Sequence, residues 1–417
     1  MLKAIKQWMP RDQRGLLWGV MFVWLTSLLF LLFTGGELGV LLFFITTVIT
    51  TYLLLLGKWS GIKDIKGERA STNPGQRLET GDSFHVETSF EIPGFWPISY
   101  VLIKDEITHH QFGKQIYQSS FVPTTYRTGK VSYTISNLKR GAYDFGATEC
   151  SITDLLNLFQ HKATILLPVT FKVYPKSIRI KEWSFVSALR SGVRDSSMSR
   201  NQKETTEIDG VREYTNGDRL SRIHWNASAK TGELKSKEFI RESVPKILIV
   251  IDQYHHSYHD EEQFELAVST AASIIRYSSK QQIPIGLFSP GKKVNYYEVQ
   301  QGMTYSHRLE EHLLYVKRDG ENNIPKALLH RHLTRLQGSL IVVITPEKSN
   351  LLFHRLVGMK KMNLHPCHIC IAPQKDSEVE KWKRRLDTEQ IHCYMVDSLK
   401  ELPVVLGGKT VEKNRLS

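Results

Sequence analysis

Two uncharged stretches near the N-terminus constrain this chain more than any other feature of its sequence. Residues 16–33 and residues 38–57 contain no charged side chain. A helix of about 20 apolar residues is long enough to cross the hydrocarbon core of a bilayer. Because only residues 34–37 separate the two stretches, they predict a helical hairpin of two membrane spans whose ends emerge on the same side.

Basic residues flank this predicted hairpin on both outer sides, whereas its connector has none. The flanking cations are Lys3, Lys6, Arg11 and Arg14 before the first span, and Lys58, Lys63, Lys66 and Arg69 after the second. Positive charges beside spans favour the cytoplasmic side. We therefore expect a multi-pass protein of a bacterial cell membrane, with the lipid bilayer as a partner and with both termini and the soluble domains in the cytoplasm. A cleaved signal peptide is disfavoured because a second span follows the first.

Composition limits what the rest of the chain can be. Of its 417 residues, 41% are hydrophobic and 23% are charged, so most of the chain should fold, into two or three domains. Lys and Arg exceed Asp and Glu by 55 to 42, which suits anionic lipid, acidic protein surfaces or nucleic acid. No basic segment interleaved with aromatic residues matches a nucleic-acid motif, so we expect no nucleic acid as a partner. The four cysteines fit a reducing compartment.

The periodicity of the sequence differs between residues 68–180 and residues 246–417. Short alternating runs such as 83–88 and 131–135, separated by Gly, Pro and Asn, predict a β-sandwich-like domain in the first region. In the second region a continuous apolar run ends at Asp252, as in a parallel strand buried on both faces. Helices are predicted over 264–279, 309–316, 325–336 and 378–386, and further strands over 283–288, 340–344, 368–371 and 391–396.

This alternation of strand and helix predicts a doubly wound α/β domain. The fold class is therefore a membrane-anchored α+β multidomain chain. Residues 1–67 form the transmembrane hairpin, 68–180 the β-sandwich-like domain, 181–245 a linker with a sequence motif, and 246–417 the α/β domain.

The motif occupies residues 209–234, which read DGVREYTNGDRLSRIHWNASAKTGEL. Asn216 and Gly217 predict a turn. Asp218 can cap a short helix in which Arg219 and Arg222 share a face. Ile223 and Trp225 are predicted to supply packing for this segment.

The spacing R-E-Y, G-D, R-x-x-R-I-x-W and A-S-A-K closely resembles the hallmark of the domain of unknown function 58 family. The order of hairpin, β region and α/β domain also resembles this family, whose C-terminal domain is similar to a von Willebrand factor A module. The resemblance implies a partner, because such proteins are often encoded beside AAA+ ATPases of the MoxR type. We interpret the chain as a membrane-anchored, non-enzymatic scaffold or adaptor that binds a protein partner, an AAA+ ATPase of the MoxR type.

Two interpretations of the motif stay open. Its charged residues could form a satisfied polar network that joins the β region to the α/β domain. Alternatively, they form a partner-docking or anion-binding surface, for which the candidates are Arg212, Asp218, Arg219, Arg222, Trp225 and Lys230. Catalysis by the motif is not expected, because no nucleophile with a recognisable base accompanies it.

The resemblance also implies a metal-binding loop of the form D-x-S-x-S, completed by a Thr and an Asp from later loops. Here Tyr254 and His256 replace the two serines after Asp252, and Thr345-Pro346-Glu347 stands where family members often have T-D-G. We therefore expect a degenerate site with no metal of the family type, and no cofactor. The alternative is a metal-assisted hydrolase in which Asp252, His255 and His256 hold Zn²⁺ or Ni²⁺.

A second cluster of potential metal ligands lies further along the chain and contains Cys367, His368, Cys370 and Cys393. A single C-x-x-C without a second pair is a poor match to a zinc site. We interpret these cysteines as buried thiols.

Overall fold

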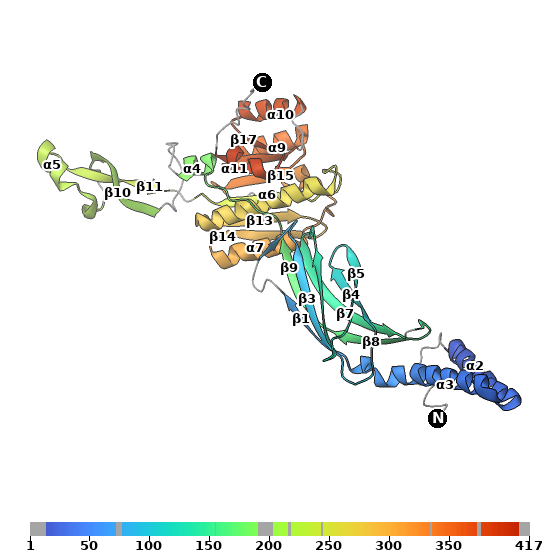
Figure 1. Ribbon diagram of the computed structural model, residues 1–417. Coiled ribbons are helices and arrows are strands. Elements are labelled where there is room, and N and C mark those ends of the chain that lie inside the picture. Colours follow the sequence, from blue (N-terminus) through green and yellow to red (C-terminus); the bar gives the residue numbers. More distant parts are fainter. Residues whose placement is uncertain are drawn as a thin grey trace, which may run out of the picture. The chain divides into compact units, whose positions relative to one another are not determined.

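The computed structural model describes residues 14–71, 77–154, 156–190, 203–215, 218–242, 245–333, 336–372 and 377–407 (Figure 1). They form two compact units, Met1–Tyr174 and Pro175–Ser417. The basic flank at Lys3, Lys6 and Arg11 and the predicted turn at 216–217 lie outside the described residues.

The first unit begins with the predicted pair of apolar helices, α2 (Arg14–Thr34) and α3 (Gly36–Trp59). Both are long and apolar enough to cross a membrane. Gly35 and Gly36 both have positive φ values, 59° and 81°, a conformation that glycine adopts without strain and that allows the sharp reversal between the helices. Trp24 donates a hydrogen bond to Thr47, and Thr46 donates one to Ser27, so polar side chains join the two apolar helices.

The strands of the first unit follow the 3₁₀-helix η2 (Ile62–Asp64) and form two sheets. One sheet has the order β1 (Lys66–Ser71), β3 (Phe84–Glu91) and β6 (Thr128–Ile135). The other has the order β2 (Leu78–Glu79), β9 (Thr170–Tyr174), β7 (Gly141–Thr153), β4 (Val101–His109) and β5 (Gly113–Phe121), and β8 (Gln160–Leu166) pairs with β7. Burial alternates along β3 and β4, as the sequence predicted, and the hydrophobic cores contain side chains from both sheets.

A buried ion pair connects the two sheets. Arg69 on β1 donates to Asp105 on β4 at 2.6 Å, and the two side chains are only 3% and 1% exposed. Tyr133 and Thr148 also donate hydrogen bonds to Asp105. The assignment of Arg69 to the membrane-flanking charges is therefore wrong, because its charge is neutralised inside the β region.

The second unit is built on a six-stranded sheet with the order β14-β13-β12-β15-β16-β17. Its strands are β12 (Ile247–Ile251), β13 (Ile285–Pro290), β14 (Val294–Gln300), β15 (Leu340–Thr345), β16 (His365–Ile371) and β17 (His392–Val396). All neighbours pair in parallel except β14, which runs antiparallel to β13 at one edge.

Helices cover both faces of this sheet. On one face Ile247, Ile249 and Ile251 pack with α6 (Glu261–Lys280), α7 (Met303–Tyr315) and α11 (Leu402–Leu406). On the other face Leu248 and Val250 pack with α8 (Ile324–Ala327), α9 (Asn350–Lys361) and α10 (Ser377–Thr388). The continuous apolar run before Asp252 therefore reflects burial on both faces. The mixed α/β body that the sequence predicted is confirmed at this level.

Several details differ from the sequence-based expectations. The helix predicted over 325–336 is reduced to α8, because Leu329 and His330 donate to carbonyls only three residues back, as in turns. Strand β14 and helix α9 had not been predicted. Ile178 and Ile180, assigned to the β region from the sequence, pack in the core of the second unit with α4 (Ser184–Arg190).

The motif forms a separate two-stranded element within the second unit, which we call the arm (Figure 1). It consists of β10 (Lys203–Glu213), the 3₁₀-helix η3 (Leu220–Arg222), α5 (Trp225–Thr231) and β11 (Lys235–Glu242). β10 and β11 pair antiparallel. The 3₁₀-helix η5 (Leu399–Glu401) precedes α11.

Candidate functional site

Hydrogen bonds within the arm fix the loop that follows β10. Arg212 donates to the Asp218 carboxylate at 2.7 Å, and the backbone N–H and hydroxyl of Thr215 donate to the other carboxylate oxygen. The hydrogen bond from Arg212 is the main cause that lowers the pKa of Asp218 below its ordinary value. Asp218 is therefore held in its charged form as the centre of this loop.

The predicted role of Asp218 as a helix cap is wrong. Its carboxylate faces Arg212 and Thr215, and the helical segment after it is only the short η3. Arg219 has an extended backbone at the start of η3, so Arg219 and Arg222 do not share a face of one helix. Proximity to the cation of Arg212 explains why Asp218 prefers the loop interaction to capping.

His224 is the residue that caps α5, which the sequence reasoning missed. The ring Nδ1 of His224 accepts a hydrogen bond from the Ala227 N–H at 3.1 Å. The backbone N–H of His224 donates to the Lys235 carbonyl at 2.8 Å. Ser228 accepts a hydrogen bond from the Lys235 N–H at 2.8 Å. These bonds attach α5 to β11, while Ile223 is buried beside it. Histidine is uncommon as an N-cap, so this role is hard to predict from the sequence.

Two large apolar side chains of the arm lie in solvent. Leu220 is 71% exposed and Trp225 is 66% exposed, although Trp225 was predicted to supply packing. Arg219 and Lys230 are also exposed, and neither forms an ion pair with another described residue. We call Arg219, Leu220, Trp225 and Lys230 the arm surface. It combines exposed apolar area with two exposed positive charges on a framework held by internal hydrogen bonds.

The second candidate region lies at the carboxyl edge of the six-stranded sheet, and we call it the sheet-edge network. Asp252 is fully buried there and accepts from the Thr345 hydroxyl at 2.6 Å and from the Tyr254 N–H at 2.8 Å. Thr345 in turn accepts from the Glu347 N–H at 3.0 Å. Ser349 donates to Glu347 at 2.5 Å and also caps α9. Neighbouring protein groups therefore occupy the oxygens of this network.

Burial dominates the electrostatics of the sheet-edge network. It raises the pKa of Asp252 to about 6, although the hydrogen bonds from Thr345 and Tyr254 act in the opposite direction. Burial also raises the pKa of Glu347. Raised pKa values make both carboxyl groups easier to protonate. A hard cation prefers ionised carboxylates as ligands, so this environment disfavours its binding.

The histidines of the neighbouring loop do not join Asp252. His255 and His256 are exposed and their rings lie 3.7 Å apart, while the ring of His255 approaches the Gly320 carbonyl. Among the described residues, no group of three or more His, Cys, Asp or Glu side chains is placed to hold a metal ion. Asp252 with His255 and His256 thus gains no geometric support as a metal site.

The cysteine cluster is divided between the two faces of the sheet. Cys367 packs in the core on the α6 face, whereas Cys370 and Cys393 pack in the core on the opposite face. Residues three apart on a strand point in opposite directions, so Cys367 and Cys370 cannot bind one ion together. Burial raises the pKa of the Cys370 thiol to about 11, which keeps it protonated.

Comparisons with known proteins agree with the family resemblance. Residues 210–354 match the family model described as protein of unknown function DUF58. The match covers most of the arm and four of the six strands of the sheet, β12 to β15. The chain is also 25% identical over 358 residues to the uncharacterized protein YeaD of Bacillus subtilis (strain 168), covering 84% of this chain and 86% of that protein. The resemblance predicted from the motif is therefore confirmed.

Solved structures add little. The C-terminal domain of wzt aligns with 29% of this chain and 78% of its own, at 11% identity and a TM-score of 0.22. A beta-glucosidase from Listeria innocua aligns with 26% of this chain at 9% identity and a TM-score of 0.19, and the chain spans 16% of that enzyme's length. Scores this low carry no argument about fold or function.

Proposed function

We propose that this protein is a membrane-anchored, non-enzymatic adaptor whose arm surface binds a protein partner in the cytoplasm. The two sheets of the first unit would be a β-sandwich. The strand order of the second unit, with an antiparallel edge strand and helices on both faces, supports assigning it as a doubly wound, von Willebrand factor A-like domain.

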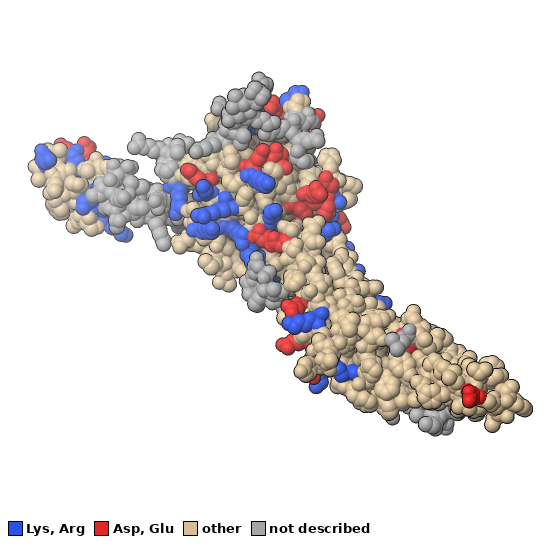
Figure 2. Space-filling model, viewed as in Figure 1, with Lys and Arg blue, Asp and Glu red and all other residues tan. Residues whose placement is uncertain are grey.

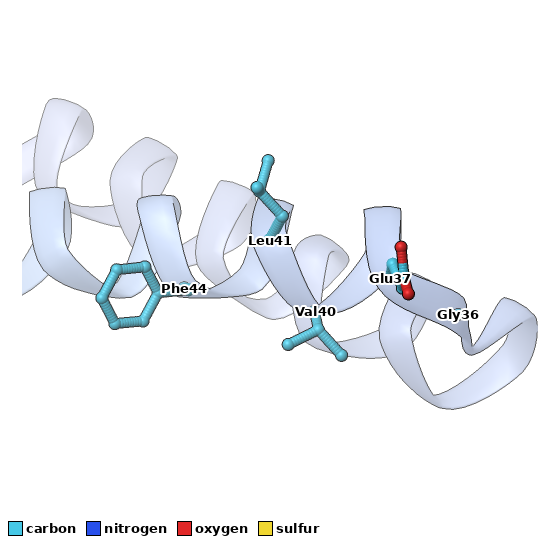
Figure 3. Close-up of a pocket in the computed structure, with 5 residues that line it drawn as sticks. All are labelled: Gly36, Glu37, Val40, Leu41 and Phe44. Atoms are coloured by element: carbon cyan, nitrogen blue, oxygen red, sulfur yellow. The ribbon is translucent and has the colours of Figure 1, made fainter.

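Helices α2 and α3 support the membrane anchor. Their surfaces carry exposed apolar side chains along both helices, including Phe22, Leu32 and Phe44. In the space-filling view this end of the molecule has almost no charge on the face shown (Figure 2). The shallow hollow lined by Val40, Leu41 and Phe44 near Glu37 is open apolar helix surface of the kind that lipid covers (Figure 3). The flanking cations favour cytoplasmic termini.

The arm surface is the observation that carries the adaptor proposal. Exposed Leu220 and Trp225 cost solvation free energy in the free protein, and burial in a complex would recover it. Tryptophan and arginine are also the residue types that most often dominate binding energy at protein interfaces. Arg219 and Lys230, which lack an ion-pair partner among the described residues, would favour a partner with an acidic surface.

The family resemblance supports an AAA+ ATPase of the MoxR type as this partner. In such a complex the ATPase would supply the energy, and the adaptor would supply the location at the membrane. The partner's contribution to the interface would be an acidic rim around an apolar pocket that receives Trp225.

Site-specific photo-crosslinking tests this proposal. A photoreactive amino acid replaces Leu220 in the full-length protein in its own membranes, and crosslinked species are identified by mass spectrometry. The matched control replaces Leu329, which is 57% exposed and follows α8 in the same unit, outside the residues of the arm. We expect a crosslink to an ATPase from position 220 that disappears with Trp225→Ala and is absent from position 329. Equal crosslinking from both positions would contradict the proposal.

A further inference from the structure

We propose that the β region of the first unit is itself a membrane-contacting domain, whose loops at one end insert apolar side chains into the cytoplasmic leaflet beside the hairpin. These loops are 92–100, 122–127 and 154–159, and we call them the membrane loops. The inference rests on the proposed membrane anchoring by α2 and α3. It adds a second, peripheral attachment that would orient the soluble part of the chain on the bilayer.

Strand pairing brings the three loops together. Loop 92–100 connects β3 to β4, loop 122–127 connects β5 to β6, and loop 154–159 connects β7 to β8. Glu91 at the end of β3 pairs with Thr128 at the start of β6. Val101 at the start of β4 pairs with both Phe121 on β5 and Ile152 on β7. All three loops therefore leave the sheets at the same end of the β region.

Aromatic contacts join this end to the last turns of α3. The ring of Trp59 lies 5.6 Å from the ring of Phe95 and 5.4 Å from that of Trp96, and Tyr52 stacks on Trp96 at 6.1 Å. Tyr and Trp are the residue types that collect at the membrane–water interface. Phe95 and Trp96 of loop 92–100 therefore form one aromatic cluster with Tyr52 and Trp59 of α3.

Arg127 holds the loops on the helix end. Its guanidinium donates to the carbonyls of Ile92 and Trp96 in one loop and to the carbonyl of Ser60, which caps α3. Arg127 itself belongs to loop 122–127, so one side chain ties two loops to the hairpin. Its N–H donors are therefore used by backbone carbonyls of the loop and of the helix end.

Loop 154–159 reaches further along the spans. Leu156 and Leu158 line an apolar cavity together with residues of both spans, among them Val20, Ile49 and Leu53. Leu53 precedes Trp59 by six residues, which places it about 9 Å along the helix from that interfacial tryptophan. If Trp59 marks the interface, Leu156 lies at the depth of the hydrocarbon. The carboxylate of Asp154 accepts from the N–H groups of Leu156, Leu158 and Phe159 and so fixes this loop.

The exposed side chains of the membrane loops have the character of an interfacial surface. Phe95 is 73% exposed, Tyr126 is 88% exposed and Leu156 is 51% exposed. None of the three loops contains an acidic residue except Asp154, which is buried. Each loop therefore contributes an uncovered apolar or aromatic side chain beside the spans, and a bilayer that receives the spans would cover these side chains as well.

Depth measurements on the full-length protein in phosphatidylcholine–phosphatidylglycerol vesicles test the inference. Phe95→Cys, Tyr126→Cys and Leu156→Cys are made singly and carry a spin label, whose accessibility to oxygen and to a water-soluble nickel chelate is compared. The four native cysteines are buried, so unsubstituted protein should label little and serves as the background. Phe112→Cys, an exposed aromatic at the opposite end of the β region, is the matched control, and Leu25→Cys reports the first span.

We expect labels at positions 95, 126 and 156 to collide with oxygen more than with the chelate, as at position 25, and the label at position 112 to show the reverse. Lipid exposure at position 25 together with chelate access at the three loop positions would overturn the inference and leave the anchor intact. Protection of the loop positions from both reagents would mean that protein covers them, which also overturns it. Chelate access at position 25 would overturn both the inference and the proposed anchoring.

Discussion

The arm surface and the sheet-edge network differ in what they leave open to solvent. At the sheet edge, Asp252 is buried and its oxygens are occupied by Thr345 and Tyr254. On the arm, Leu220 and Trp225 are exposed beside cations without ion-pair partners among the described residues. Hydrogen bonds within the arm hold the segments that carry these exposed side chains.

This difference predicts that the sheet-edge network contributes to stability and that the arm surface contributes to binding. Polar groups that satisfy one another inside a core contribute to folding and offer nothing to a ligand. Exposed apolar groups on a fixed framework contribute little to folding and can gain by association. Substitutions at the sheet edge should therefore change stability, and substitutions on the arm surface should change binding.

The largest effect is expected from Asp252→Asn and its dependence on pH. Burial raises the pKa of Asp252 to about 6 in the folded chain, whereas this carboxyl has a pKa of about 4 in the unfolded chain. Between about pH 4 and pH 6, Asp252 is therefore protonated in the folded chain and ionised in the unfolded chain. The free energy of unfolding therefore falls as the pH rises through this window, by about 3 kcal/mol in total, and this contribution is constant above it.

Asp252→Asn cannot ionise and should lose this dependence. Urea unfolding of the detergent-solubilised chain at both ends of the pH window measures the difference. Glu262→Gln, at an exposed position of α6, is the control for removing a carboxylate and should keep the wild-type slope. An unchanged slope in Asp252→Asn would show that this carboxyl titrates normally.

Thr345→Val should have the next largest effect. It removes the hydroxyl that donates to Asp252 and accepts from the Glu347 N–H, so the buried Asp252 carboxylate loses one of its donors and the Glu347 N–H loses its acceptor. We expect a loss of about 1–3 kcal/mol in the free energy of unfolding. Thr304→Val, at an exposed position of α7, should change it by less than about 0.5 kcal/mol. Equal effects would mean that the buried network contributes no stability.

Ser228→Ala should have a smaller and local effect. It removes the hydroxyl that accepts from the Lys235 N–H at 2.8 Å, and so loosens α5 from β11. A loss of about 1 kcal/mol should appear as faster hydrogen exchange of the Lys235 amide. Exchange in β12 and β15 should stay at the wild-type rate. A parallel change there would mean that the arm and the sheet unfold together.

Trp225→Ala combined with Leu220→Ser should have the smallest effect on stability, within about 0.5 kcal/mol, because both side chains are mainly in solvent. The same urea transitions measure it. A loss comparable to that of Thr345→Val would show that these side chains pack against protein, and it would favour the interpretation of the motif as a structural network.

The sequence predicted the regular parts of this fold well because their signals are local. The charge-free runs gave α2 and α3, and the apolar run before Asp252 gave β12 with both faces buried. Helices α6 and α10 followed from their periodicity. Edge strand β14 was missed because its residues are all exposed or half-buried and form no strong apolar face.

The candidate site was harder to predict because its geometry depends on partners distant in sequence or in unexpected roles. Asp218 was predicted to cap a helix, but its carboxylate accepts a hydrogen bond from Arg212, six residues earlier. Trp225 looked like a packing residue, yet His224 and Ile223 attach the segment to β11 and leave the indole outside. Arg69 looked like a membrane flank, and its pairing with Asp105 is visible only once the two sheets are placed together.

Binding of a partner by the arm surface is tested by a crosslinked affinity purification of the full-length protein from its own membranes. Wild type, Asp252→Asn and the double variant Leu220→Ser/Trp225→Ala are compared at equal expression, with recovered proteins quantified by mass spectrometry. We predict that an AAA+ ATPase is recovered with wild type and with Asp252→Asn, and that at least tenfold less is recovered with the double variant. Undiminished recovery with the double variant, or loss with Asp252→Asn alone, would contradict the assignment of binding to the arm.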